Sequence, residues 1–200
     1  MVYTSSKSIS FADFIAQYGD DPRYDLIDGE LRELEPTGPH ESKAGKISGR
    51  LYAEILRLGL SWTIPKTCLI KPPATEATAF RPDVIVLDEA APGTEPLWQR
   101  ESIITSGNAI RLIVEGVSTN WQDDYARKTE EYALLGVPEY WIADYRGLGG
   151  LDFIGRPKQP TSTVCQLIGE DYQKQLYRLH EPIKSPMLSE LSLCLADVMP

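Results

Sequence analysis

The chain has 200 residues, of which 42% are hydrophobic and 24% are charged, and its formal net charge is −9 at pH 7. This size and composition are typical of one globular domain, which buries roughly 70% of its unfolded surface. The negative charge counts against a nucleic-acid-binding protein, whose binding face is usually basic, unless a local basic patch dominates.

Cysteine spacing and hydropathy exclude further classes of protein. The cysteines Cys68, Cys165 and Cys194 lie far apart and match neither a disulfide framework nor a zinc site. No apolar stretch approaches the about 20 residues that a membrane helix needs, and residues 1–10 lack the apolar segment of a secretory signal. We therefore expect a cytoplasmic protein without a membrane partner.

The N-terminal segment predicts a short helix and a hairpin. Residues 8–22 favour a helix with Ser10 as its N-cap. Residues 23–34, "RYDLIDGELREL", predict a β-hairpin that turns at Asp28 and Gly29, because apolar residues alternate on both sides of that pair.

Residues 40–59 predict a long helix that ends at Gly59. Its apolar face consists of Ala44, Ile47, Leu51, Ile55 and Leu58. At about 100° per residue, four basic residues of this helix fall within an arc of roughly 60°. They are Lys43, Lys46, Arg50 and Arg57. This basic stripe could follow a nucleic-acid backbone, or it could be an ordinary solvated helix face.

The middle of the chain predicts strands at residues 62–70, 83–88 and 109–117, then a helix at 121–136 and a strand at 139–145. An apolar strand, a helix and another apolar strand in succession favour a parallel strand pair in a covered sheet.

The C-terminal part predicts a second hairpin, from residues 163–168 and 172–179. The fold class is therefore α/β (α+β), with a core in the order helix-strand-strand-strand-helix-strand and β-hairpins near both ends. We expect one domain over residues 1–200, with the core at about 40–145 and a β extension at about 160–200.

Two carboxylates interrupt apolar strands. Asp83 opens the segment 83–88, and Glu115 lies late in the segment 109–117. If the strands are neighbours, the two side chains could share a Mg²⁺ ion, which takes one or two protein carboxylates and keeps most of its water. Alternatively, Asp83 caps a strand end and Glu115 pairs with an arginine.

Lys128 lies on the apolar face of the predicted helix at 121–136. At about 100° per residue, it falls in a stripe roughly 80° wide with Trp121, Tyr125, Tyr132 and Leu135. It could bring a cation to the two carboxylates and stabilise charge on a phosphate. Alternatively, its stem packs between the tyrosines and its amine reaches solvent.

Four segments resemble the PD-(D/E)XK nuclease superfamily. They are "YDLIDGEL" at 24–31, "RPDVIVLD" at 81–88, "LIVEGVS" at 112–118 and "DYARKTEEYALLGVPEYWIAD" at 124–144. Within the superfamily, the chain resembles a bacterial family described as restriction endonucleases, many of unknown function. The resemblance implies a restriction-endonuclease-like core.

The resemblance also implies site residues. Asp83 and Glu115 would bind Mg²⁺ or Mn²⁺, together with the backbone carbonyl of Gly116. The lysine position two residues after the glutamate holds Val117. In this family the lysine is thought to have moved to the next helix, which matches Lys128.

The implied function is a metal-dependent endonuclease that cleaves phosphodiesters, with DNA as the expected partner and a homodimer as the expected assembly. The alternative is a catalytically inactive nucleic-acid-binding or assembly module on the same fold. A third candidate is a metal-dependent hydrolase of a smaller phosphate-containing substrate, because a fold does not determine its substrate.

Other polar residues carry weaker signals. His40 precedes the long helix and either assists proton transfer or is simply a residue of the helix N-terminus. Glu30 and Glu41 are candidates for an extra acidic group near the metal. We interpret Asp124 as a first-turn residue that interacts with the helix dipole.

Overall fold

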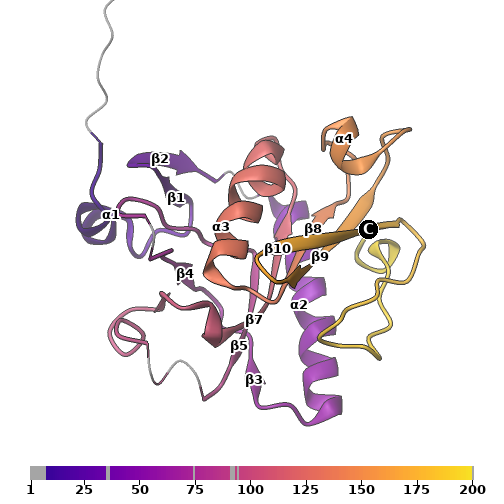
Figure 1. Cartoon of the computed structure of the whole chain (residues 1–200), viewed down its shortest axis with the longest axis horizontal. Helices are drawn as coiled ribbons and strands as arrows, with labels where there is room; N and C mark the ends of the chain where they lie inside the picture. The colour runs from indigo at the N-terminus through magenta and orange to yellow at the C-terminus, as the bar shows by residue number, and fades with distance from the viewer. Residues whose placement is uncertain (1–7, 35–36, 74, 91–92, 94, 200) are drawn as a thin grey trace, which may run out of the picture.

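The structure is a computed structural model that describes residues 8–34, 37–73, 75–90, 93 and 95–199 (Figure 1). Within these residues, a six-stranded sheet has the strand order β10-β9-β8-β7-β5-β3. Its strands are β3 (Trp62–Thr63), β5 (Val84–Asp88), β7 (Ile110–Gly116), β8 (Glu139–Asp144), β9 (Thr161–Ile168) and β10 (Asp171–Arg178).

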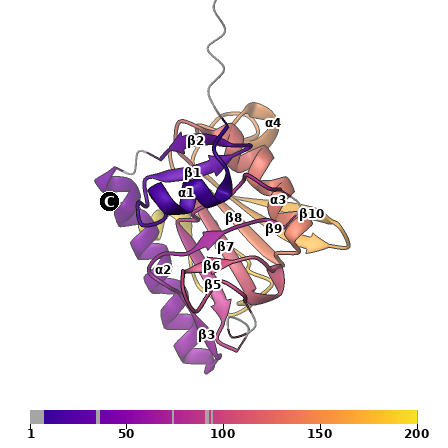
Figure 2. The same ribbon diagram turned by 90° about the vertical axis from the view of Figure 1, so that its left-hand side faces the viewer.

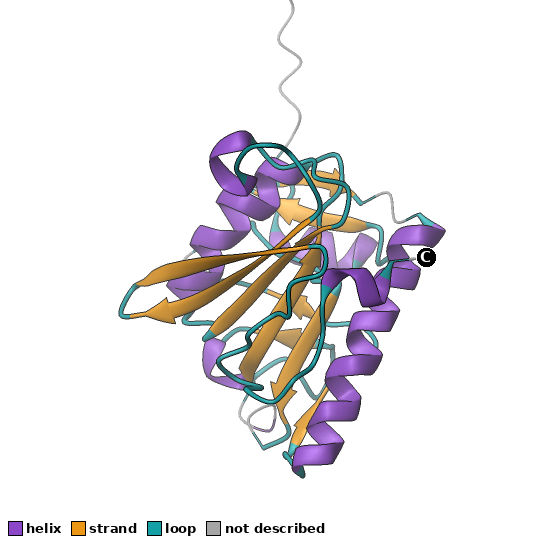
Figure 3. Cartoon of the chain, turned by 90° about the vertical axis from the view of Figure 1, so that its right-hand side faces the viewer, coloured by secondary structure: helices purple, strands orange, loops and turns teal. Residues whose placement is uncertain are grey.

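The strand β7 pairs in parallel with β8 and antiparallel with β5. The helix α3 (Lys128–Leu135) connects the two parallel strands. The predicted α/β class and the predicted parallel pair are therefore confirmed. The predicted C-terminal hairpin is also confirmed, since β9 and β10 pair antiparallel (Figure 3).

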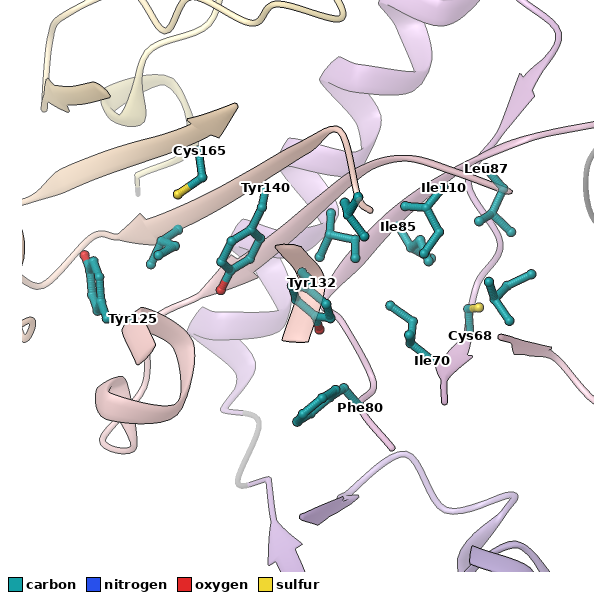
Figure 4. Close-up of a cluster of buried hydrophobic side chains, with 14 of the residues drawn as sticks. Cys68, Ile70, Phe80, Ile85, Leu87, Ile110, Tyr125, Tyr132, Tyr140 and Cys165 are labelled. Atoms are coloured by element: carbon teal, nitrogen blue, oxygen red, sulfur yellow. The ribbon is translucent and has the colours of Figure 1, made fainter. Parts of the chain in front are cut away.

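Two helices cover opposite faces of this sheet (Figures 1 and 2). The helix α2 (Gly38–Leu58) packs Leu51 against Val114 and other residues of one face. On the other face, Ile113 packs with Tyr132 of α3. Alternate residues of β7 thus enter different cores, as the period of two in a strand requires. Figure 4 shows the core on the α3 face, where Tyr132 and Tyr140 lie near Ile85.

The helix α2 begins two residues earlier than predicted. The Thr37 side chain accepts a hydrogen bond from the His40 backbone amide, which is the usual N-cap contact. Pro39 then lies in the first turn, where its missing amide hydrogen costs nothing. The helix ends at Gly59 in the left-handed conformation, as predicted.

The N-terminal elements are α1 (Phe11–Tyr18), β1 (Tyr24–Ile27) and β2 (Glu30–Glu33). Ser10 caps α1, and the hairpin turns at Asp28 and Gly29, both with positive φ. Both predictions are confirmed. The strand β1 is tied to the rest of the chain by an isolated bridge from Leu26 to Ala79.

The predicted strand at residues 62–70 is wrong. It divides into β3 and the separate strand β4 (Leu69–Ile70), which pairs with β6 (Ile103–Ile104). Pro65 lies between the two parts and has no amide hydrogen for a sheet ladder, so the strand cannot continue through it.

The predicted helix at 121–136 is present, but it contains the π-turn η3 (Asp123–Arg127) immediately before α3. A π-turn carries more residues per turn than an α-helix, which rotates the preceding side chains relative to those of α3. The remaining short helices are η2 (Gly107–Ala109), α4 (Leu151–Ile154) and η4 (Leu195–Val198). Within the described residues, no helix is long and apolar enough to span a membrane.

Truncation of the apolar face of α2 should destabilise the fold. Leu51 is fully buried, whereas Leu56 on the same helix is 63% exposed. We expect Leu51→Ala to lower the free energy of unfolding by about 2–5 kcal/mol, because it leaves a cavity. The matched control Leu56→Ala should stay within about 0.5 kcal/mol. Urea unfolding followed by circular dichroism measures both values, and equal losses would contradict the packing described above.

Candidate active site

Lys128 lies at the centre of a buried group of carboxylates. Its side chain is 6% exposed, and its Nζ atom is 3.1 Å from Glu115 Oε1, 3.4 Å from Asp124 Oδ1 and 3.8 Å from Asp25 Oδ2. These carboxylates come from β7, from the π-turn η3 and from β1. The helical pattern thus correctly placed Lys128 on the inner face, and the alternative of an amine that reaches solvent is wrong.

Aromatic packing on the same helix explains this orientation. Tyr125 and Tyr132 are buried on either side of Lys128 in the sequence, and Figure 4 shows both rings within the core. The hydroxyl of Tyr132 donates a hydrogen bond to Glu115 Oε1 at 2.8 Å. Glu115 therefore pairs with a lysine and a tyrosine, not with the arginine that the alternative interpretation required.

Asp83 lies beside Glu115 at the edge of this group. The β5–β7 ladder pairs Val84 with Val114, and one further step along both strands brings Asp83 opposite Glu115. The Gly116 backbone amide donates to Asp83 Oδ2 at 2.6 Å. The two carboxylates that the sequence singled out therefore meet at one end of neighbouring strands.

His40 is a direct partner of Asp83. Its Nε2 atom is 2.9 Å from Asp83 Oδ1, and its Nδ1 atom is 2.8 Å from the Tyr145 hydroxyl. The hydrogen bond to Asp83 raises the pKa of His40 above its usual value. His40 is thus more than a residue of the helix N-terminus, because it connects α2 to the strands that carry the carboxylates.

Burial changes the protonation of the carboxylates. Desolvation raises the pKa of Asp25 and of Asp124 to about 6, although the nearby Lys128 lowers both. Desolvation likewise raises the pKa of Glu115 well above 4.5. Burial alone would lower the pKa of Lys128, but Glu115, Asp124 and Asp25 together raise it well above 10.5. For these carboxyl groups the effect of desolvation therefore outweighs the attraction of the single ammonium group.

The sequence reasoning missed Asp25 and the main contact of Asp124. Asp124 is 6% exposed and pairs with Lys128, so its interpretation as a helix-dipole residue was incomplete. Asp25 also makes a second contact, because its Oδ1 accepts a hydrogen bond from the Arg81 backbone amide at 2.7 Å. The available signal for Asp25 was the one used for Glu115, namely a carboxylate beside buried apolar residues of a strand.

The two proposed extra acids lie elsewhere. Glu30 has a 62% exposed side chain 3.7 Å from Arg32, and Glu41 is exposed on the first turn of α2. Neither one joins the buried carboxylates. The N-terminal hairpin does contribute an acid to the site, but that acid is Asp25.

The predicted basic stripe on α2 is not a free cationic surface. Lys43 is buried, with its amine 4.4 Å from the Tyr145 ring centroid. Lys46 donates to the carbonyl of Met199 at 3.0 Å, and Arg57 pairs with Glu54 and Glu190. Arg50 is exposed. Three of the four side chains are therefore already engaged within the chain, which weakens their assignment to nucleic-acid binding.

The chemistry of the donors fits a hard divalent ion. Asp83 and Glu115, which lie opposite each other on neighbouring strands, offer carboxylate oxygens, the ligand type that Mg²⁺ prefers. Among the described residues, no three or more His, Cys, Asp or Glu side chains form a metal-binding group.

Comparison with known proteins identifies the family and the fold of the chain. The model of the Uma2 family, described as "Putative restriction endonuclease", matches residues 11–196. The chain belongs to this family. The match includes all of the buried carboxylates, Lys128 and His40. The predicted family relationship is therefore confirmed.

A solved structure shares the fold of this Uma2 chain. It is a crystal structure described as a "putative nuclease belonging to DUF820" from Anabaena variabilis, with a TM-score of 0.69. The alignment covers 95% of this chain and 97% of the other, at 15% sequence identity. At that identity the likeness shows the fold alone. No curated protein matches the chain.

The raised pKa of Asp25 predicts a pH dependence of stability. Between about pH 4 and pH 6 the folded state keeps a proton on Asp25 that the unfolded state releases, so the free energy of unfolding falls as pH rises through this window. The Asp25→Asn variant cannot ionise, so its stability relative to the wild type should increase from pH 4 to pH 7, by up to about 3 kcal/mol.

Urea unfolding in the presence of EDTA measures this difference without interference from metal. Glu30→Gln, on the exposed strand β2, is the matched control and should follow the wild type at each pH. Identical pH profiles for Asp25→Asn and the wild type would contradict the effect of burial on Asp25.

Proposed function

We propose that this chain is a metal-dependent endonuclease that hydrolyses phosphodiester bonds, with DNA as its substrate. The observation that carries the proposal is the meeting of Asp83, Glu115 and the buried Lys128 at the ends of β5 and β7. Membership of the Uma2 family, described as "Putative restriction endonuclease", supports the reaction class. Buried charged groups with raised pKa values cluster at functional sites, which also supports the proposal.

Asp83 and Glu115 would bind Mg²⁺ or Mn²⁺, with the Gly116 carbonyl as a third protein ligand. Such an ion, when bound, lowers the pKa of a coordinated water and neutralises charge on a phosphate oxygen. Lys128 would supply positive charge to the transition state from a fixed position, because Glu115, Asp124 and Asp25 restrain its amine. Tyr132 would keep Glu115 in place through its hydrogen bond.

The proposed roles explain why the lysine is carried by α3. The usual position, two residues after the glutamate, holds Val117, which is fully buried in the core on the α3 face. Lys128 reaches Glu115 from across that face, so its ammonium group lies near the same carboxylate. The charge is thus present although the strand does not provide it.

The choice of DNA as substrate rests on the family and not on a basic surface. The net charge of −9 opposes binding to a polyanion, and much of the predicted basic stripe contacts the protein itself. Divalent ions at the site would offset this repulsion locally. We therefore expect DNA binding that depends on metal, and we retain the homodimer as part of the proposal.

Removal of either charged group should strongly reduce cleavage. We expect Asp83→Asn and Lys128→Met each to lower the cleavage rate by about 100- to 1,000-fold, because the first weakens metal binding and the second removes a cation that stabilises transition-state charge. Plasmid and oligonucleotide cleavage with Mg²⁺ and with Mn²⁺ measures the rates, and EDTA should stop the reaction. Circular dichroism must show that each variant is folded, because Lys128→Met leaves its carboxylate partners without compensation.

The matched control is Glu41→Gln, which removes an exposed carboxylate near His40 and should keep at least half of the wild-type rate. Full activity in Asp83→Asn would overturn the assignment of the site. DNA binding without cleavage under both metals would favour the inactive binding module. Cleavage of small phosphodiesters but not of DNA would favour the third candidate function.

A further inference from the structure

Gly116 lies in β7, directly after Glu115, in a space that admits no side chain. A Cβ atom built on Gly116 would be 2.9 Å from His40 Cε1 and 3.2 Å from Asp83 Oδ2. Gly116 is not among the glycines with positive φ, so its backbone conformation is open to any residue. The requirement for glycine at this position therefore comes from the His40 ring and the Asp83 carboxylate.

The His40 ring cannot easily move aside. Each of its two nitrogens has a partner, Asp83 on one side and the Tyr145 hydroxyl on the other. Its side chain is 12% exposed, and Tyr145 is buried. A rotation that made room at Gly116 would break both hydrogen bonds.

Asp83 is restrained through both of its carboxylate oxygens. Oδ2 accepts from the Gly116 amide and Oδ1 contacts His40 Nε2, so the plane of the carboxylate is set by two contacts from different elements. Gly116 contributes to both contacts. Its amide provides one of them, and its missing side chain leaves room for the ring that provides the other.

We propose that His40 and Tyr145 are positioning residues for Asp83, and that Gly116 is glycine because the His40 ring occupies the space of its side chain. The steric part concerns the protein alone. The part that concerns metal binding rests on the proposed function, in which Asp83 is a metal ligand.

A thermal-unfolding cycle tests the steric part without any activity measurement. We expect Gly116→Ala to lower the Tm by roughly 3–10 °C when His40 is present, because overpacking a filled site is destabilising. In the His40→Ala background the same change should lower the Tm by less than about 2 °C, because the ring is gone. An equal loss in both backgrounds would overturn the proposal.

Gly45→Ala is the matched control for this cycle. Gly45 lies on α2, the helix that carries His40, and a Cβ atom there would meet nothing within 4 Å. This control should leave the Tm unchanged or raise it slightly, since alanine favours a helix more than glycine does. If Gly116→Ala alone fails to fold, recovery of a folded protein in the double variant supports the proposal, and failure of both variants overturns it.

Titration of the metal-free protein with Mn²⁺, followed by calorimetry, tests the positioning of Asp83. We expect His40→Ala to weaken Mn²⁺ binding by about 10- to 100-fold, as is typical for a residue that orients a metal ligand. Tyr145→Phe should weaken Mn²⁺ binding by a smaller factor. His40→Gln should recover part of the affinity, because its amide can donate to Asp83. Glu41→Gln should bind as the wild type does.

The two proposals can fail separately. Unchanged Mn²⁺ affinity in His40→Ala would overturn the positioning role and leave the nuclease proposal intact. Absence of Mn²⁺ binding in the wild type would overturn the proposed metal site, while the unfolding cycle would still decide whether His40 requires glycine at residue 116.

Discussion

The ion pairs between one buried ammonium group and its carboxylates are the interaction on which the rest of the site depends. Lys128 is out of contact with water and so needs anionic partners, and it has three from separate parts of the chain. Desolvation raises the pKa of each of these carboxyl groups, although the ammonium group of Lys128 lowers it. Three carboxylates from different parts of the chain thus converge on one buried lysine.

The two halves of the site differ in how they are restrained. Glu115 is fixed within the core by Lys128 and Tyr132, which both lie on α3. Asp83 is fixed at the rim by His40 from α2 and by the Gly116 amide from β7. The two helices that cover opposite faces of the sheet thus each control one carboxylate. Relative movement of either helix against the sheet would alter the geometry of the pair.

Several features could be predicted from residues alone because they depend on local periodicity. The inward direction of Lys128 followed from its place between Tyr125 and Tyr132, and the neighbouring strands followed from the order of apolar segments. The contact between Asp25 and Lys128 could not be predicted in this way, since 103 positions separate them and only the tertiary fold brings them together. The π-turn η3 was likewise hidden, because a spacing of 3.6 residues was assumed throughout the helix. The basic stripe was overestimated for a related reason, as a helical projection does not reveal that the C-terminal segment supplies carbonyl partners for Lys46.

The N-terminal hairpin matters for any attempt to transfer this candidate site to another protein or to reduce it in size. Asp83, Glu115 and Lys128 all lie between Arg81 and Asp144, so the hairpin could be mistaken for a dispensable addition. Yet Asp25 reaches from β1 to Lys128 with one oxygen and to the Arg81 amide with the other, two residues before Asp83. The guanidinium of Arg81 in turn binds the carbonyl of Gly19, just beyond α1. A graft that carried only the central strands and α3 into another scaffold would lose this brace, so the smallest transferable unit of the site has to begin at the first helix.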